Sequence, residues 1–354
     1  MKSPAIVLAN GRYRTVNGKV AHGLVRGSDR FQVLAVVDPS CAGRDAGDML
    51  DGIRRHIPIV ASLSEALTVG DISPEYCIVG IATHGGHFTP ELRTLLLEAA
   101  HAGLSIVNGL HDCASDDSAI VAAQRHGATI IDLRKPRPKH ELHFWSGAIH
   151  QVRAPRLAVL GMDCAIGKRT TARLLTEALN KAGIRAEMIY TGQTGWMQGG
   201  RYGFVLDSVI NDYVSGELEH AIVSCEREVQ PDIMILEGQS SLRNPSGPCG
   251  AELLLSAAAQ GVILQHAPGR EFFEGYEALG CRLPAVDDEI RLIACYGVRT
   301  LAVTLHDQGL STQELAEAQQ ILQSRLGIPV VRPLEEGMDA LLSVVRRLLQ
   351  EVTP

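Results

Sequence analysis

Several features that mark whole classes of protein are missing from this chain of 354 residues. No apolar run approaches the roughly 18 residues that suggest a membrane-spanning helix, so we expect no span. No run of basic residues stands out and the formal net charge is −7, which argues against general nucleic-acid binding. The eight cysteines include no C-x-x-C pair, a usage typical of reduced thiols. We therefore expect a cytoplasmic protein that acts on a small molecule. A homo-oligomer is expected from base rates alone.

Two ligand-binding signatures are also missing. No G-x-G-x-x-G follows the first expected strand, so a dinucleotide site is poorly supported. His84, His87 and His111 follow expected strands, but no carboxylate-rich ligand set accompanies them at a diagnostic spacing. We interpret these histidines as hydrogen-bonding loop residues and expect no metal site.

The length favours two domains, and the order of elements predicts an α/β fold in both. Residues 1–133 alternate short apolar runs with helical patterns, which predicts a parallel, doubly wound sheet. The apolar segment at 5–8 is too short for a secretion signal and reads as the first strand. The expected strands here are 5–8, 33–37, 77–81, 104–107 and 128–131, with helices at 63–67, 90–103 and 118–127.

A proline-rich, charged stretch at 134–155 interrupts this alternation and is the expected linker. The second doubly wound domain then spans 156–354. Its expected strands are 157–160, 187–190, 233–236, 262–265, 300–305 and 329–332, with helices at 170–182, 251–259, 312–325 and 338–350. We find no internal repeat and no low-complexity segment.

The most informative segment is the glycine-containing turn between the strand at 157–160 and the helix at 170–182. It reads GMDCAIGKRTT from Gly161 to Thr171 and resembles the phosphate-loop pattern G-x-x-x-x-G-K-[ST]. In such a loop the backbone N–H groups, the helix N-terminus and the lysine all attract a phosphate. The expected phosphate-binding residues are Gly161, Asp163, Cys164, Ala165, Ile166, Gly167, Lys168, Arg169, Thr170 and Thr171.

The loop departs from the pattern in two places. Five residues, not four, separate Gly161 from Gly167, and Arg169 stands where the Mg²⁺-binding hydroxyl belongs. Thr170 and Thr171 follow, but each helical step turns the side chain by about 100°, so neither points where residue 169 points. The sequence therefore predicts a phosphate site without the usual metal ligand.

Other candidate site residues follow the later strands of the second domain, where ligands of parallel sheets gather. A glycine-rich loop is expected after 187–190, and Asp207, Asn211 and Asp212 are expected on a helix, with Asp207 and Asn211 on one face. That face would bind substrate or simply be solvated. Glu237 ends a buried strand, where NTPases place a metal-holding carboxylate and where a metal-free site would place a general base. The candidate substrate-binding residues are Thr191, Gly192, Gln193, Thr194, Asp207, Asp212, Gln239, Ser240, Ser241, His266 and Arg270.

Taken together, four segments resemble a phosphate-loop family catalogued as a domain of unknown function. They are GMDCAIGKRTT at 161–171, TGQTG at 191–195, LEGQSS at 236–241 and HAPGR at 266–270. The resemblance implies a Rossmann-like N-terminal domain and a C-terminal domain similar to dethiobiotin synthetase. That enzyme shares the five-residue spacing but has threonine after its lysine, where this chain has Arg169. Some family members are D-glutamate N-acetyltransferases that use acetyl-CoA and act beside an N-acetyl-glutamate racemase.

The resemblance therefore implies transfer of acetyl from acetyl-CoA to the amino group of an acidic amino acid, with D-glutamate the best guess. We expect Glu237 to be the base, Lys168 to hold phosphate, Gln193 and its neighbours to stabilise the oxyanion, and Arg270, with His266, to bind a substrate carboxylate. One alternative is an ATP- and Mg²⁺-dependent kinase or carboxylate–amine ligase, in which Glu237 would hold the metal. Another is a non-catalytic sensor of nucleotide or CoA.

Overall fold

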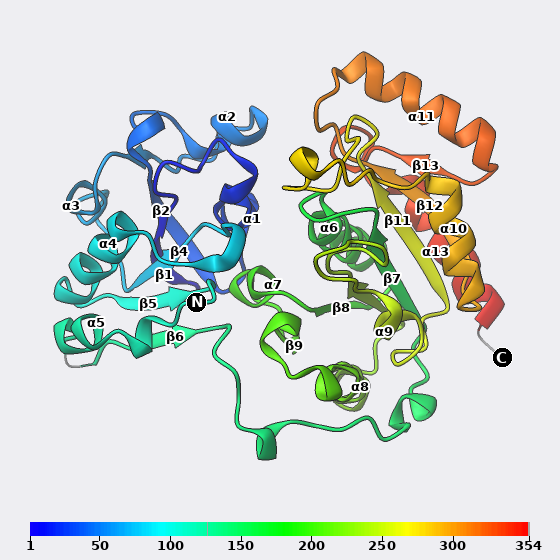
Figure 1. The fold of residues 1–354 in the computed structure, drawn as a ribbon, viewed down its shortest axis with the longest axis horizontal. Coiled ribbons are helices and arrows are strands. Elements are labelled where there is room, and N and C mark those ends of the chain that lie inside the picture. Colours follow the sequence, from blue (N-terminus) through cyan, green and yellow to red (C-terminus); the bar gives the residue numbers. More distant parts are fainter. Residues whose placement is uncertain (126, 353–354) are drawn as a thin grey trace. The chain divides into compact units, whose positions relative to one another are not determined.

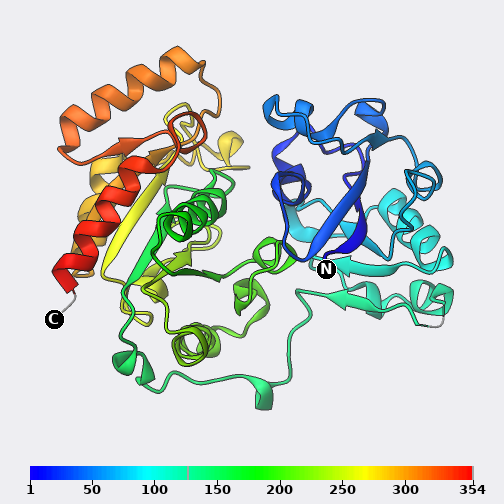
Figure 2. The same cartoon turned by 180° about the vertical axis from the view of Figure 1, so that it is seen from behind.

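A computed structural model describes residues 1–125 and 127–352, and these form two compact units (Figures 1 and 2). Unit 1 comprises Met1–Arg137 and Gln193–Gly200. Unit 2 comprises Pro138–Gly192 and the described residues from Arg201 onward. Two segments depart from the predicted division. Residues 193–200 were expected in the second domain but belong to unit 1, and most of the expected linker belongs to unit 2.

The sheet of unit 1 is wholly parallel, with strand order β3-β2-β1-β4-β5-β6. This is the doubly wound order of Rossmann-like folds, in which the winding direction reverses between β1 and β4. The strands are β1 (Ser3–Leu8), β2 (Phe31–Val37), β3 (Ile59–Val60), β4 (Tyr76–Val79), β5 (Ser105–Asn108) and β6 (Ile130–Asp132).

Both faces of this sheet are covered, as a parallel sheet requires. Along β1, Ile6 and Leu8 enter one core cluster, while Ala5 and Val7 enter the cluster on the other face. The covering helices are α1 (Lys19–Arg26), α2 (Ala46–Asp51), α3 (Leu63–Ala66), α4 (Pro90–His101) and α5 (Ser118–Ala123). The sequence analysis missed α1 and α2, which are only 8 and 6 residues long. The helix expected at 118–127 ends at Ala123, and its residue His126 lies outside the described residues.

The sheet of unit 2 is also parallel, with order β13-β12-β11-β7-β10-β8-β9. The strand that leads into the phosphate loop, β7, lies in the middle between β10 and β11. The strands are β7 (Arg156–Gly161), β8 (Ala186–Tyr190), β9 (Tyr202–Gly203), β10 (Ile233–Glu237), β11 (Gly261–His266), β12 (Thr300–Leu305) and β13 (Val330–Val331). The predicted α/β class is confirmed for both units.

Helices cover both faces of this second sheet. Leu157 and Val159 of β7 pack in the cluster that also contains Leu175 of α6, while Ala158 and Leu160 enter the cluster on the opposite face. The helices of unit 2 are α6 (Lys168–Lys181), α8 (Asn211–Val229), α9 (Ala251–Leu254), α10 (Val286–Cys295), α11 (Thr312–Leu326), α12 (Pro333–Glu336) and α13 (Asp339–Val352). Within 1–125 and 127–352, no helix is long and apolar enough to cross a bilayer.

Three local predictions for the second half of the chain were wrong. The glycine-rich stretch expected to be a loop contains helix α7 (Gln193–Met197), which belongs to unit 1. Asp207 lies in a short 3-10 turn before α8, so it does not share a helical face with Asn211. The helix expected at 251–259 stops at Leu254, and the backbone of Ala258 adopts a positive φ of 47° that no α-helix continues.

Candidate functional site

The phosphate loop runs from the end of β7 to the start of α6, and its backbone is curled tightly. Ala165 and Gly167 adopt positive φ angles of 53° and 98°. A Cβ atom at Gly161 would lie 2.8 Å from Cδ of Lys168, so only glycine lets the lysine pack here. Gly167 is the N-cap of α6 and offers no side-chain acceptor. The first N–H groups of the helix are therefore left to another acceptor, for which a phosphate oxygen is well suited.

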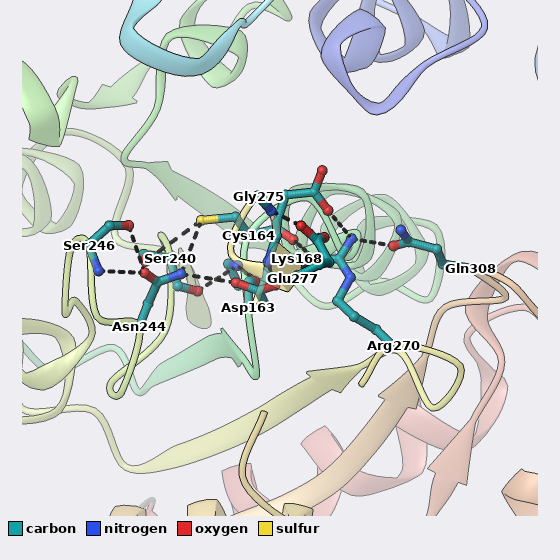
Figure 3. A network of polar contacts seen from close by, with 11 residues as sticks. Asp163, Cys164, Lys168, Ser240, Asn244, Ser246, Arg270, Gly275, Glu277 and Gln308 are labelled. Carbon is teal, nitrogen blue, oxygen red and sulfur yellow. Dashed lines mark hydrogen bonds and ion pairs between the residues drawn. The ribbon is translucent and has the colours of Figure 1, made fainter. Parts of the chain in front are cut away.

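Lys168 joins the phosphate loop to the segment that follows β10. Its side chain is buried, and Nζ donates to the backbone oxygens of Asp163, at 2.5 Å, and of Ser240, at 2.8 Å (Figure 3). Both contacts are with neutral carbonyl groups, so its positive charge is not cancelled by them. This position suits a charge that meets a phosphate at the mouth of the loop.

Asp163 serves as a buried brace of the loop, which corrects its predicted role as a phosphate contact. Its side chain is 0% exposed and accepts from Asn244 Nδ2 at 3.0 Å, from Arg270 at 2.7 Å and from the backbone N–H of Glu274 at 2.7 Å. A carboxylate so fully engaged would also repel a phosphate. Figure 3 shows Asn244 and Arg270 reaching Asp163 from two different loops.

The role predicted for Arg270 is corrected as well. Its guanidinium group donates to Asp163 and to the backbone oxygen of Cys164, both at 2.7 Å, and pairs with Glu274 at 2.9 Å and with Gln308. Two carboxylates already share this cation. We therefore do not assign it to a substrate carboxylate.

His266 is not a cation for a substrate either. Burial lowers the pKa of this imidazole to about 4, so it is neutral at neutral pH. Its Nδ1 is buried without a hydrogen-bond partner among the described residues.

Thr171, the second threonine of the loop, makes its side-chain contact in the core of unit 2. Thr171 donates its hydroxyl proton to Gln265 Oε1 at 2.6 Å, and Thr304 donates to the same oxygen at 2.6 Å. All three side chains are buried between α6 and the neighbouring strands. The Thr171 hydroxyl is thus committed to the core, which corrects its predicted part in phosphate binding.

Glu237 ends β10 and lies beside the strand end of β8. Its side chain is 2% exposed, and Oε2 accepts from the backbone N–H of Thr191 at 3.1 Å. Thr191 also donates its hydroxyl to the backbone oxygen of Glu237 at 2.7 Å and accepts from Gln239 at 3.1 Å. Burial raises the pKa of Glu237, and the charge of Arg169 is the strongest influence in the opposite direction.

The remaining predicted residues divide between the two units. Cys164 is part of the loop, its thiol lies 3.7 Å from the hydroxyl of Ser240, and Ser241 is buried. Gln193 and Thr194 are buried in unit 1, where a Cβ added to Gly109 would lie 2.8 Å from Cγ of Gln193. Asp207 and Asp212 are exposed.

The histidines of unit 1 follow β4 and β5 as predicted. His87 lies 3.1 Å from Asp112, which also accepts from the backbone N–H of Phe88. A Cβ atom at Gly86 would lie 2.6 Å from the His111 ring. The side chain of His84 lies outside the described part of the chain.

Sequence reasoning missed three residues that build the site: Asn244, Glu274 and Gln308. They follow β10, β11 and β12, respectively, and all contact Asp163 or Arg270. The signal that would have found them is topological, because the carboxyl ends of neighbouring parallel strands meet at one edge of the sheet.

Comparison with known proteins follows the same two units. The family model described as the P-loop domain of the domain of unknown function DUF1611 matches residues 143–342, and its Rossmann-like companion matches residues 39–136. The chain is also similar to two curated proteins named D-glutamate N-acetyltransferase. The one from Pseudoalteromonas sp. is 28% identical over 80% of this chain and 83% of its own length. The one from Tritonibacter scottomollicae is 27% identical over 80% and 85%.

A solved structure agrees over nearly the whole chain. The crystal structure of a DUF1611 family protein from Anabaena variabilis has a TM-score of 0.88 and 29% sequence identity, covering 98% of this chain and 100% of that one. The matched P-loop domain alone takes in more than half of the chain, including the loop, Glu237 and the Asp163–Arg270 pair. The chain therefore belongs to the DUF1611 family, and carries that family's Rossmann-like and P-loop domains.

Proposed function

We propose that this chain is an N-acetyltransferase that moves acetyl from acetyl-CoA to the amino group of an acidic amino acid, with D-glutamate the preferred candidate. One observation carries the proposal above the others. The phosphate loop has an arginine where nucleotide hydrolases hold magnesium, and the strand-end carboxylate beside it is buried and under the influence of that arginine. Such a site binds phosphate without requiring a metal and keeps a carboxylate for proton transfer.

The residues of the loop suit the phosphates of coenzyme A. Gly167 leaves the first N–H groups of α6 without a side-chain cap, and Lys168 and Arg169 add two positive charges at the same helix start. A pyrophosphate needs such donors and cations, whether or not a metal accompanies it. When bound, acetyl-CoA would supply the thioester carbonyl carbon that the substrate amine attacks. As the amide C–N bond forms, the thioester C–S bond would break, and CoA would leave and take up a proton as the free thiol.

The part of this chain in the chemistry is proton removal. An amino acid carries a protonated ammonium at neutral pH, which has no lone pair to attack a carbonyl carbon. Glu237 in its ionised form would accept that proton and leave the neutral amine. Its raised pKa makes it a stronger base than an exposed glutamate, and Arg169 with the Thr191 N–H group favours the ionised form needed for the step.

The acidic substrate class is supported by the curated relatives, both named for D-glutamate. Arg270 is engaged by Asp163 and Glu274, so we do not propose it as the group that binds the substrate carboxylates.

The test is an assay of free CoA thiol released from acetyl-CoA in the presence of D-glutamate, L-glutamate or D-aspartate, each with EDTA or with Mg²⁺. We expect thiol release with D-glutamate that EDTA does not abolish, and N-acetylglutamate as the product by mass spectrometry. Calorimetry with acetyl-CoA and with ATP, each with and without Mg²⁺, separates the alternatives. Metal-dependent ATP binding without acetyl-CoA binding would replace the proposal by a ligase or kinase. Binding without turnover of any of these amines would favour a sensor.

A further inference from the structure

Unit 2 contains a cavity of about 370 Å³ beside the amino ends of β12 and β13, which we call the β12 cavity. Its lining comes from the start of β12, from the turn at 327–329 that joins α11 to β13, and from the second half of α13. The volume falls within the roughly 300–1,000 Å³ that is usual for small-molecule sites. The phosphate loop follows the carboxyl end of β7 in the same parallel sheet, so the β12 cavity lies at the opposite edge of that sheet.

The inner wall of the β12 cavity is apolar. Val344 and Leu348 lie four residues apart on α13, so they share one face of the helix, and both are buried in the core cluster that α13 forms with the sheet. Leu301 of β12 packs against the same cluster, and Ile328 lines the cavity from the turn before β13. This wall can cover the hydrocarbon part of a small organic molecule, a contribution that inorganic phosphate cannot use.

The rim of the β12 cavity carries an excess of positive charge. Arg299 forms an ion pair with Glu351, and both side chains line the cavity. Arg347 also lines it and is exposed, and within residues 1–125 and 127–352 its guanidinium has no carboxylate partner. Two arginines against one glutamate leave a formal charge of one positive unit. The planar guanidinium of Arg347 can bind a carboxylate through two parallel hydrogen bonds.

One polar group in the wall has no partner of its own. Thr300, the first residue of β12, lines the cavity, and its hydroxyl is buried without a hydrogen-bond partner among the described residues. Buried hydroxyl groups in folded proteins are nearly always hydrogen-bonded. A ligand oxygen in the cavity would give this hydroxyl the partner that the chain does not supply.

We propose that the β12 cavity is a binding site for a small amphiphilic carboxylate, a molecule with one carboxylate group and an apolar body. Arg347 binds the carboxylate, and Thr300 adds a hydrogen bond from its hydroxyl. The apolar body packs on Val344 and Leu348. A single carboxylate matches the excess of one positive charge, and the apolar wall favours such a ligand over a free inorganic anion. This site is separate from the phosphate loop and does not depend on the proposed acetyl transfer.

The test is a titration of the full-length protein with phenylacetate, followed by ligand-observed NMR. We expect saturable binding with a Kd on the order of 1 mM, which is usual for a ligand of about ten non-hydrogen atoms. Arg347→Ala should weaken binding at least tenfold, because it removes the charge-assisted hydrogen bonds to the carboxylate. Arg347→Lys should fall between the two, because an ammonium keeps the charge without the planar fork.

Thr300→Val tests the hydroxyl in the wall of the β12 cavity. This variant should bind phenylacetate about threefold more weakly. Its free energy of unfolding, measured by urea denaturation, should not fall, because the hydroxyl has no partner in the chain to lose.

The matched control is Arg346→Ala, which removes an exposed arginine that precedes Arg347 on α13 and is not among the residues that line the cavity. It should bind phenylacetate as the wild type does. The neutral analogue 2-phenylethanol should bind at least tenfold more weakly than phenylacetate, and inorganic phosphate should not displace phenylacetate. Equal binding by the wild type and Arg347→Ala, or equal binding of phenylacetate and 2-phenylethanol, would overturn the proposal. So would displacement by an equal concentration of phosphate, or no saturable binding of phenylacetate or hexanoate up to about 20 mM, roughly twenty times the expected Kd.

Discussion

The carboxylate of Asp163 and the guanidinium of Arg270 form an ion pair of 2.7 Å in which both side chains are almost wholly buried. One belongs to the phosphate loop and the other follows β11, so the pair ties the loop to the neighbouring strand end. Each partner makes further hydrogen bonds, with Asn244 and Glu274 on one side and Gln308 and Cys164 on the other.

Removing one member of this pair should destabilise the protein strongly. We expect Asp163→Ala to lower the free energy of unfolding by about 3–5 kcal/mol, because Arg270 would remain buried near a single carboxylate. Urea denaturation measures the change. Glu271→Ala, which removes an exposed partner of Arg282, serves as the control and should cost about 1 kcal/mol or less. If Asp163→Ala lowered the free energy of unfolding as little as Glu271→Ala, the ion pair would not stabilise the loop.

Glu237→Gln tests the proposed base. The amide keeps the size of the side chain and an oxygen that can accept from Thr191, but it cannot take up a proton. We expect kcat to fall by about 10²–10⁴-fold with acetyl-CoA affinity retained. In the wild type, activity should decline as the pH falls through the Glu237 pKa, with a midpoint above the usual 4.5 because burial raises it. A near-wild-type rate for Glu237→Gln would remove Glu237 from the mechanism.

Arg169→Thr places a hydroxyl where phosphate loops hold magnesium and removes one positive charge. We expect metal-free binding of acetyl-CoA to weaken about 10- to 100-fold. This is the effect of losing one hydrogen bond to a charged group, which contributes ~1.5–3 kcal/mol. The acid limb of the pH profile should also move up, because Arg169 lowers the Glu237 pKa. Calorimetry and pH-rate profiles measure the two effects. Thr170→Ser, which keeps the loop charge, is the control. Unchanged acetyl-CoA binding in Arg169→Thr would place the phosphates away from this residue.

His266 should make the protein sensitive to acid. Its pKa falls from 6.5 to about 4 on folding, so the unfolded chain binds a proton more readily than the folded one between these values. The stability that its neutral form contributes is complete above about pH 6.5 and is lost as the pH falls towards 4. About 3 kcal/mol is at stake, because one pKa unit corresponds to ~1.4 kcal/mol. His266→Phe should show a smaller loss of stability than the wild type between pH 7 and pH 4. If the wild type and His266→Phe lost the same stability between pH 7 and pH 4, His266 would not be the source of the acid sensitivity.

Local patterns in the sequence were sufficient for the fold class and the phosphate loop. Alternation of short apolar strands with helices predicts parallel sheets, and the residues from Gly161 to Lys168 form a strand-to-helix turn whose chemistry is local to the chain. The placement of Glu237 beside that turn also followed from sequence, because carboxyl ends of parallel strands share an edge.

The roles of Asp163, Arg270 and Thr171 could not be read in the same way. Thr171 is hydrogen-bonded to Gln265, which is 94 residues away. Asp163 contacts Asn244 and Arg270, which are 81 and 107 residues away. A charged side chain near a ligand site reads as ligand-binding until its long-range partner is known. The placement of residues 193–200 in unit 1 was missed for a related reason, because their contacts with Arg30 and Gly23 span well over a hundred residues.

The sequence by itself determined the two α/β units, the phosphate loop and the replacement of the magnesium hydroxyl by Arg169, since these depend on neighbouring residues and on periodicity. Only the tertiary structure decided which polar groups remain for a ligand. Arg270 and Asp163 form an ion pair with each other. The Thr171 hydroxyl is hydrogen-bonded to Gln265 in the core, and residues 193–200 belong to unit 1. The physical reason is that a buried polar group takes its partner from whichever segment the fold brings to it, and that choice is not written in the local sequence.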